Sequence, residues 1–582
     1  MKQHIPASDL LGEKNGRAQA AAHMGAGQPP ASPAAAPEAA PAAASEPAAV
    51  SEPADAGTTS ISVTKSAALM SVLVIVSRIT GLMRTWGQAI ALGVTGLSSV
   101  YTVANNMPNM LYELVAGGVI MTAFLPTYLA VHKKAGQKGA ARYASNLFTI
   151  VALAMIVLTV ISLFFADFII WTNSAGAQEG FDHDLSVYFF RFFAIEIVLY
   201  ALSSIISGIL NAERDYFWSN AAPIFNNVIC TLSFVIYLVA KDSQPALAIL
   251  ALAIGNPLGV LVQVLLQIPS LHRHGIRLHF VVDLHDPALK DMLSIGLPTL
   301  VVTIASFPTV AVMSSAASQI TAAGPSIAYY SRIWYMLPYS VFAVPITVAL
   351  FTELSHFATD KDMDSFKSGM LFGINRINFW LVPFALYLMV FAPELSYILA
   401  AGRIDAQALS DMSIYLVFLS IALPVYGIST LLQKVCSALH KMRVYALASV
   451  IAAAVQVAFC LALAPLLGLA GVAFSSTLFY AAVDVVTFIN LKSELGSLGT
   501  RSIAASFVRS LAIGLAGAAV AALILAGLDR YLGGVQSLIT AVIYCVVAGI
   551  PAVVTTYGAA LLAKIPESKE IHALMAKVRR RG

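Results

Sequence analysis

Residues 66–92 have the sequence SAALMSVLVIVSRITGLMRTWGQAIAL, a mostly apolar run that contains two arginines, Arg78 and Arg84. The run is long enough to cross about 30 Å of hydrocarbon as a helix. One stripe of that helix would carry polar or small side chains at helical spacing, namely Ser77, Thr80, Gly81, Arg84 and Gln88. An arginine near the middle of a bilayer costs roughly 3 kcal/mol, so it usually faces a wet cavity or a partner. The segment therefore predicts a membrane helix with a cationic face suited to an anion.

The composition of the whole chain indicates a polytopic membrane protein. Of its 582 residues, 58% are hydrophobic and 11% are charged, whereas soluble domains are about 25% charged. Its net charge of +4 is too small to argue for nucleic acid as a partner. The four cysteines lie in apolar stretches without CxxC or His pairing, so we expect neither a disulfide nor a metal site.

Apolar runs separated by short polar breaks predict about fourteen membrane helices. They lie near residues 66–92, 97–130, 143–172, 184–211, 219–240, 245–269, 289–318, 323–352, 366–400, 405–436, 443–465, 469–492, 503–527 and 537–563. With the N-terminus in the cytoplasm, twenty Lys and Arg fall in inside loops or the C-terminal tail, and three, Lys241, Arg403 and Arg530, fall outside. This positive-inside pattern predicts that both termini are cytoplasmic.

An internal repeat organises these helices. Residues 208–216 resemble residues 437–445 at an offset of 229, and the same offset joins Tyr101 to Tyr330. Because the offset spans six predicted helices, the two copies have the same orientation. We therefore expect two parallel-repeat six-helix lobes with a substrate site between them, plus two C-terminal helices. The predicted units are a disordered Ala/Pro-rich tail (1–64), the two lobes (65–280 and 281–495), helices 13 and 14 (496–565) and a basic tail (566–582).

A second polar helix face is expected beside the two arginines. It would carry Ser98, Tyr101, Asn105, Asn109, Tyr112 and Glu113. Pro108 lies in the middle of this helix, where a kink would free backbone groups to line a cavity. A polar seam between helices is the alternative, although a seam would not need two arginines. In the second lobe Arg332 would bring a third cation to the interface.

No motif in the chain indicates catalysis. It lacks a Walker A loop, HExxH and GxSxG, so we expect neither an enzyme, nor an ATP-driven pump, nor a protein-bound cofactor. Energy would come from an ion gradient, the membrane potential or the substrate gradient. The embedded carboxylates available for ion coupling are Glu113, Glu196 and Asp484.

The order of several short motifs resembles the MurJ/MviN family of the multidrug/oligosaccharidyl-lipid/polysaccharide exporter superfamily, whose members flip the peptidoglycan precursor lipid II. The matching stretches span roughly residues 65 to 495. They are Ser77-Arg78 with Gly81 and Arg84, Met107-Pro108-Asn109, Ala123-Phe124-Leu125-Pro126, residues 208–212, Pro223, Gln263, residues 267–271, Tyr329-Tyr330 and residues 468–473.

The resemblance implies that Arg84 and Arg78 sit in a central cationic cavity that holds the lipid's diphosphate. Arginine suits this anion because its forked donors are always charged. Arg332 would join them, and Asn105, Asn109 and Tyr112 would line the cavity. The chain departs from the family pattern where acidic residues are usual, with Thr85 after Arg84 and Ser99 at the start of the second helix. It also has Tyr112 and Gly117 at two charged family positions, and Arg332 is displaced by one residue.

The sequence thus predicts a transporter that moves lipid II, or a similar polyprenyl-diphosphate glycolipid, across the bacterial cytoplasmic membrane by alternating access. Membrane lipids and cell-wall synthesis proteins are its candidate partners. Two alternatives stay open. One is an ion-coupled exporter of drugs or of other lipid-linked glycans from the same superfamily, and the other is a non-transporting scaffold of the cell-wall machinery.

Overall fold

The computed structural model describes residues 59–113, 118–400 and 404–568, and in these residues the chain is helical without a β-strand. Long apolar helices satisfy their own backbone hydrogen bonds, which is a condition for crossing hydrocarbon. The predicted all-α membrane fold is confirmed. The predicted tails lie outside the described residues, except for their short stretches next to the helices.

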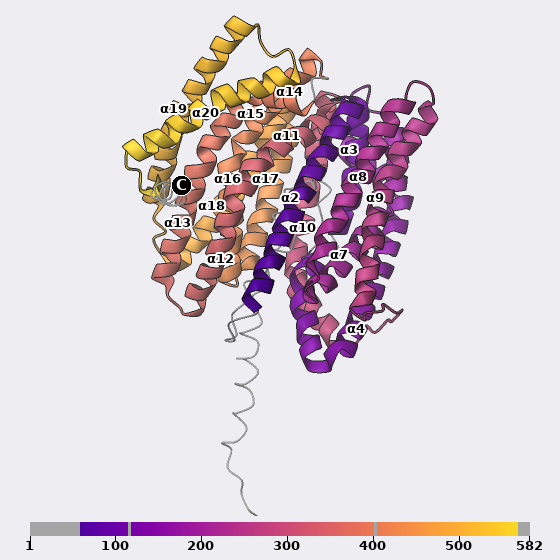
Figure 1. Ribbon diagram of the computed structural model, residues 1–582. Helices are drawn as coiled ribbons and strands as arrows, with labels where there is room; N and C mark the ends of the chain where they lie inside the picture. The colour runs from indigo at the N-terminus through magenta and orange to yellow at the C-terminus, as the bar shows by residue number, and fades with distance from the viewer. Residues whose placement is uncertain (1–58, 114–117, 401–403, 569–582) are drawn as a thin grey trace, which may run out of the picture.

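Two groups of helices stand side by side, the first indigo to magenta and the second pink to orange (Figure 1). The first lobe comprises α2 (Thr59–Leu92), α3 (Gly96–Tyr112), α4 (Gly118–Phe164), α5 (Ala166–Ser174), α6 (His183–Phe193), α7 (Glu196–Ala212), α8 (Tyr216–Ala240) and α9 (Pro245–Arg273). The second lobe comprises α10 (Pro287–Ile320), α11 (Gly324–Pro338), the π-helix η2 (Tyr339–Ala343), α12 (Val344–Thr359), α13 (Met363–Val390), α14 (Ala392–Leu399), α15 (Ala406–Ser420), α16 (Ala422–Ala438), α17 (Met442–Ala462) and α18 (Ala464–Leu495).

Each lobe has its own apolar interior. Two clusters of buried side chains lie mainly in the first lobe and one large cluster lies mainly in the second, although Ala89 and Val94 join the large cluster and Leu289 and Met292 of α10 join a first-lobe cluster. The last helices, α19 (Thr500–Leu532) and α20 (Leu538–Leu562), are yellow in Figure 1 and pack on the outside of the second lobe against α13 and α14. Helix α10 contacts both α4 and α17, so it connects the two lobes.

The structure does not confirm the predicted count of fourteen membrane spans. Within the described residues ten helices are long and apolar enough to cross a membrane, or eleven if α15 and α16, bent by 43°, form one span. Two of the counted helices contain a sharp break, at Gly136 (φ 66°) in α4 and at Gly468 (φ 64°) in α18. The count of fourteen therefore stays a prediction.

The helix lengths display the repeat directly. Helices α2 and α10 each have 34 residues, and the helix that follows begins at Gly96 in one lobe and at Gly324 in the other. Helices α7 and α16 each have 17 residues and begin at Glu196 and Ala422. Both follow a break in a longer helical stretch, at Ile195 and Ile421.

The register of the repeat differs from the predicted one around the end of α7. Two residues beyond each helix the backbone takes a positive φ, at Arg214 (61°) after α7 and at His440 (56°) after α16, so these two residues correspond. The predicted pairing of residues 208–216 with 437–445, at an offset of 229, is therefore wrong by three residues. Few letters match between the copies, so the helix ends are the better guide to the register.

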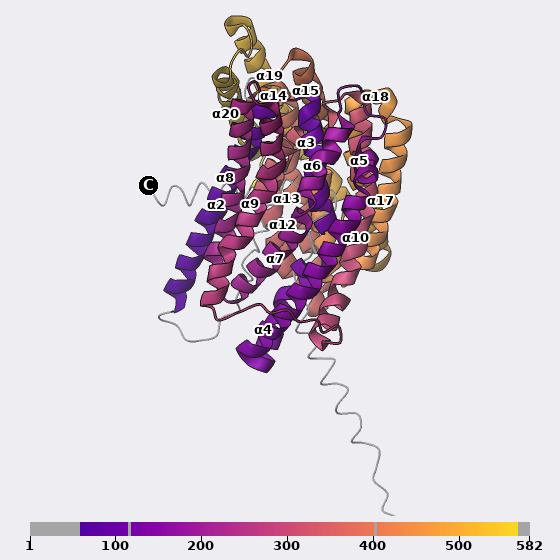
Figure 2. The same ribbon diagram turned by 90° about the vertical axis from the view of Figure 1, so that its right-hand side faces the viewer.

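The two lobes are joined at the end of the bundle where α2 ends and α3 begins. The hydroxyls of Ser98 and Tyr330 share a hydrogen bond of 2.9 Å, and the Ser326 N–H donates to Ser99 Oγ at 3.1 Å. Trp86 Nε1 donates to the Ile398 carbonyl at 3.0 Å. At the opposite end the tips of α4 and α12 lie apart in Figure 1, and the view turned by 90° shows α4 reaching beyond its neighbours (Figure 2).

Candidate functional site

A cavity of about 90 Å³ lies between the lobes near the joined end. This is room for several water molecules but not for a glycan. The first lobe contributes α3 and the second contributes α10, α11, α15, α17 and α18. The lining residues are Thr102, Val103, Asn106, Thr309, Val310, Met313, Ser314, Pro325, Ala328, Tyr329, Arg332, Tyr415, Leu419, Gln456, Ser476, Phe479 and Tyr480.

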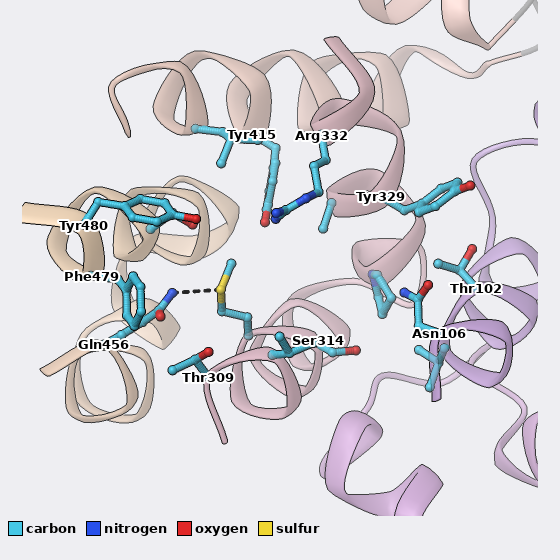
Figure 3. Close-up of a pocket in the computed structure, with 17 residues that line it drawn as sticks. Thr102, Asn106, Thr309, Ser314, Tyr329, Arg332, Tyr415, Gln456, Phe479 and Tyr480 are labelled. Atoms are coloured by element: carbon cyan, nitrogen blue, oxygen red, sulfur yellow. Dashed lines mark hydrogen bonds between the residues drawn. The ribbon is translucent and has the colours of Figure 1, made fainter. Parts of the chain in front are cut away.

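Arg332 is the arginine that lines this cavity. Its side chain points from α11 toward Tyr415 of α15, and Tyr480 of α18 lies on the same side (Figure 3). Arg332 interacts electrostatically with both of these tyrosines and with Tyr335 and Tyr426. An anion in the cavity would therefore meet a guanidinium and several hydroxyl donors.

Tyr329 of the cavity wall interacts with a second arginine, Arg84. In Figure 3 the Tyr329 ring points away from Arg332 toward α3, where Thr102 and Asn106 lie. Arg84 is one of the groups with which Tyr329 interacts electrostatically. The arginine is 5% exposed and does not line the cavity. Tyr329 therefore links Arg84 to the wall of the cavity that Arg332 lines.

Behind Arg84 a buried layer of polar side chains crosses the first lobe. Asn256 of α9 donates through Nδ2 to Glu196 Oε2 of α7 at 3.2 Å and to Asn105 Oδ1 of α3. Cys230 Sγ donates to Asn256 Oδ1 at 3.0 Å. Asn105, Glu196 and Asn256 are at most 3% exposed, so this layer is sealed from solvent.

The structure brings the predicted site residues together only in part. Asn105 belongs to the buried layer, and Asn109, one turn below it, donates to the Asn105 carbonyl at 3.2 Å. Tyr112 is half-buried, with its ring 6.0 Å from that of Tyr200. Arg78 is exposed and lies about 120° around α2 from Arg84. None of these four lines the cavity.

Sequence reasoning missed the tyrosines and the glutamine of the second lobe. Tyr415, Tyr480 and Gln456 lie in segments that look uniformly apolar, and only the packing of three separate helices brings them to Arg332. Gln456 donates to Met313 Sδ at 2.8 Å and to Ser475 Oγ at 3.1 Å. A polar amide at the middle of an apolar run was the one signal that could have identified this wall.

The positions without the usual family acids have structural uses. Ser99 accepts the Ser326 N–H across the lobe boundary, and Thr85 donates to the Gly81 carbonyl within α2 at 3.2 Å. An acid does reach the neighbourhood of Arg84, but it is Glu196, which comes from α7. The cavity region is thus less purely cationic than the local sequence around Arg84 predicts.

A family model described as "Lipid II flippase MurJ" matches residues 88–544. The chain belongs to this family. A probable lipid II flippase MurJ of Vibrio cholerae serotype O1 is 28% identical over 352 residues, which is 59% of this chain and 66% of the relative. The Rhizobium meliloti relative, also named a probable lipid II flippase MurJ, is 24% identical over 71% of this chain and 77% of its own length. The chain thus spans about two thirds to three quarters of these relatives.

Solved structures of the same fold agree with this membership. A lipid II flippase MurJ in an inward closed conformation matches with a TM-score of 0.66 at 17% identity, over 84% of this chain and 98% of the other. An inward-facing multidrug resistance MATE family transporter matches with a TM-score of 0.60 at 16% identity, over 72% and 96%. At such identities the likeness concerns the fold alone.

Proposed function

We propose that this chain carries lipid II across the bacterial cytoplasmic membrane by alternating access of the cavity between its two lobes. The observation that supports this most is the cavity with Arg332 in its wall and with Tyr329, a neighbour of Arg84, beside it, in a chain of the lipid II flippase MurJ family. Lipid II carries a diphosphate, and arginine binds such an anion strongly through its charge and its forked donors. The chemistry is binding and release, without a covalent step.

The orientation follows from the loop charges. Lys and Arg concentrate in the loops at the end away from the joined end, so that end would face the cytoplasm. The joined end, with the Ser98–Tyr330 hydrogen bond, would then close the route to the outside. The lipid's head group would then enter from the cytoplasmic end. Both termini would be cytoplasmic.

The cavity must widen to accept a glycan. A volume of about 90 Å³ suits the diphosphate alone at most. Opening of the joined end would separate α3 from α11 and expose Thr102, Asn106 and Arg332 to a wider space. In this scheme Arg332 and Arg84 hold the diphosphate, while Asn105 and Asn109 support the polar wall behind Arg84.

Reconstituted transport tests the proposal. Purified protein is placed in liposomes with fluorescent lipid II, and the lipid that reaches the other leaflet is measured. We expect Arg332→Gln and Arg84→Gln to lower the rate by at least tenfold, because each removes a charge-assisted contact to the diphosphate. Arg78→Gln is the matched control, since Arg78 lies on the exposed side of α2, and it should keep most of the rate.

Wild-type protein that moves no lipid II in this assay would contradict the proposal. Drug efflux by the same liposomes would then favour the ion-coupled exporter. Full activity of both Arg332→Gln and Arg84→Gln would contradict the assignment of the cavity as the diphosphate site, but it would not contradict the proposed function.

A further inference from the structure

Glu196 is a carboxylate in the interior of the first lobe, at 0% exposure. One of its oxygens, Oε2, accepts the Asn256 amide at 3.2 Å, while Oε1 has no hydrogen-bond partner within the described part of the chain. A buried carboxylate without full hydrogen bonding is unstable as an anion unless a cation compensates it. The question is therefore which group balances Glu196.

The ionisable groups around Glu196 come from four helices. They are Arg84 of α2, Tyr101 of α3, Tyr200 of α7 and Cys230 of α8. Helix α9 contributes the neutral Asn256, and the tyrosines of α4 bind elsewhere, Tyr128 to Glu213 at 2.8 Å and Tyr143 to Met292 Sδ at 3.3 Å. Within this set Arg84 is the cation, so it is the group that can balance Glu196.

Arg84 also has an electrostatic neighbour in the cavity wall. Its electrostatic neighbours include Tyr329, which forms part of the cavity wall. One guanidinium therefore interacts both with a fixed carboxylate inside the first lobe and with a residue of the cavity wall. The hydroxyl of Tyr101, near the same carboxylate, is buried without a hydrogen-bond partner in the described residues, so this donor can turn toward a new acceptor without first breaking a bond.

We propose that Glu196 is the exchangeable counter-ion of Arg84: it balances Arg84 while the site is empty and yields the arginine to the lipid's diphosphate when the lipid enters. This inference rests on the proposed function. A carrier must bind its substrate strongly enough to load it and weakly enough to release it. Because Glu196 competes with the diphosphate for one guanidinium, it lowers the affinity and speeds release. Glu196 is thus a positioning residue that acts through Arg84.

A purely structural role for Glu196 predicts something different. If the carboxylate only anchors Asn256, its replacement should lower the thermal stability and leave the binding constants alone. If it competes with substrate, replacement by the neutral, similarly shaped glutamine should tighten binding. Saturating transport should then slow, because release becomes harder.

The test measures binding of lipid II to the full-length protein in nanodiscs, together with transport in liposomes, between pH 5 and pH 8. We expect Glu196→Gln to bind about tenfold more tightly than wild type at pH 8 and to transport more slowly at saturation. Protonation removes the charge of Glu196 in the wild type, so the ratio of the two affinities should approach one as the pH falls. The ionisation of the lipid affects both proteins equally, so it does not change the ratio of their affinities.

Two further variants make the result specific. Glu394→Gln is the matched control, because Glu394 is a 6% exposed carboxylate of α14 with one oxygen lacking a hydrogen-bond partner among the described residues. Its affinity should stay within about twofold of wild type. In an Arg84→Gln background, the change Glu196→Gln should have no further effect on affinity, because the residue acts through Arg84.

An affinity ratio between wild type and Glu196→Gln that stays at one over the whole pH range would overturn the inference. If Glu196→Gln does not fold, Glu196→Asp is the second variant to measure. It keeps the negative charge, so its affinity for lipid II should depend on pH as that of the wild type does. Loss of this pH dependence would contradict the inference. Failure of wild type to bind lipid II at any pH would instead contradict the proposed function.

Discussion

The two lobes share one scaffold but place their charges at different positions on it. When α7 and α16 are aligned from their first residues, Glu196 of the first lobe corresponds to Ala422 of the second. When α2 and α10 are aligned in the same way, Arg84 corresponds to Val312. The buried pair of the first lobe therefore has apolar counterparts in the second.

The charged residue of the second lobe likewise has an apolar counterpart in the first lobe. Arg332 of α11 corresponds to Ala104 of α3 when these two helices are aligned from their first residues. In the second lobe Ser429 donates to Asp484, whereas its counterpart Ser203 accepts the Gln263 amide at 2.9 Å. Duplication thus preserved helix lengths and breaks, while the polar groups at the cavity diverged. We infer that an asymmetric substrate meets two chemically different walls.

The largest effect is expected when the acid of the first lobe is introduced into the second. Ala422 is 0% exposed, and the equivalent of Arg84 there is Val312. Ala422→Glu would bury a carboxylate without a matching cation, at a cost on the order of 3 kcal/mol. The yield of monodisperse protein and its thermal unfolding temperature measure this effect.

Ala422→Gln separates charge from size in that experiment. The glutamine overfills the site to a similar extent but stays neutral, so it should be less damaging than the glutamate. Adding Val312→Arg to Ala422→Glu should recover part of the stability. Equal stability of the glutamate and glutamine variants would show that the missing cation is not the reason for the loss.

A smaller effect concerns how closely the helices pack. In the first lobe α9 contacts α8 through Gly255 and Gly259, spaced as small residues are at many membrane helix interfaces. A Cβ at Gly255 would lie 2.2 Å from the Ser233 Cβ, and one at Gly259 would lie 2.5 Å from Asn226 Oδ1. Both lobes also have a side-chain hydrogen bond at this contact, Asn226 to Gln263 in the first and Gln456 to Ser475 in the second, each 3.1 Å long.

Gly255→Val should therefore destabilise the protein by about 1–3 kcal/mol, because the two helices must separate. Thermal unfolding in detergent measures the change. Gly527→Val is the control, since a Cβ on Gly527 of α19 meets nothing within 4 Å. A similar loss in both variants would mean that helix propensity rather than close packing causes the effect.

The sequence predicted the scaffold better than the site for a physical reason. Apolar length and loop charge are local properties, so each of the fourteen apolar runs corresponds to helical structure in the described residues. The counter-charge of Arg84 is not local: Glu196 lies far along the chain on α7 and reaches Arg84 only because α7 and α2 meet through α3 and α8. The residues next to Arg84 in the sequence therefore do not reveal Glu196 as its neighbour.

Arg78 illustrates the same limit on a shorter scale. Two arginines six residues apart look like a pair in the sequence, yet a helix rotates by about 100° per residue and turns them to different sides. Arg84 faces the interior, and Arg78 lies on the exposed side. The stripe of small and polar residues through Ser77 and Gln88, both buried, was the better predictor of the inner face.

The smallest effect is expected at the contact between the lobes. Tyr330→Phe removes the hydroxyl that shares a hydrogen bond with Ser98, and one such bond contributes about 1 kcal/mol. If this contact holds the joined end closed, its loss should shift the equilibrium toward the open state about fivefold. Spin labels at the exposed positions Glu179 and Gln407, on the two lobes, would report the opening as a longer distance.

The control for this experiment deletes a hydroxyl elsewhere. Tyr544→Phe removes a buried hydroxyl of α20 that has no hydrogen-bond partner in the described residues, so it should leave the distance distribution unchanged. A shift of equal size in both variants would assign the effect to general loosening. A shift in Tyr330→Phe alone would mean that an uncharged hydrogen bond between lobes of different chemistry sets the population of the closed state, because neither lobe presents a charge to the other at this contact.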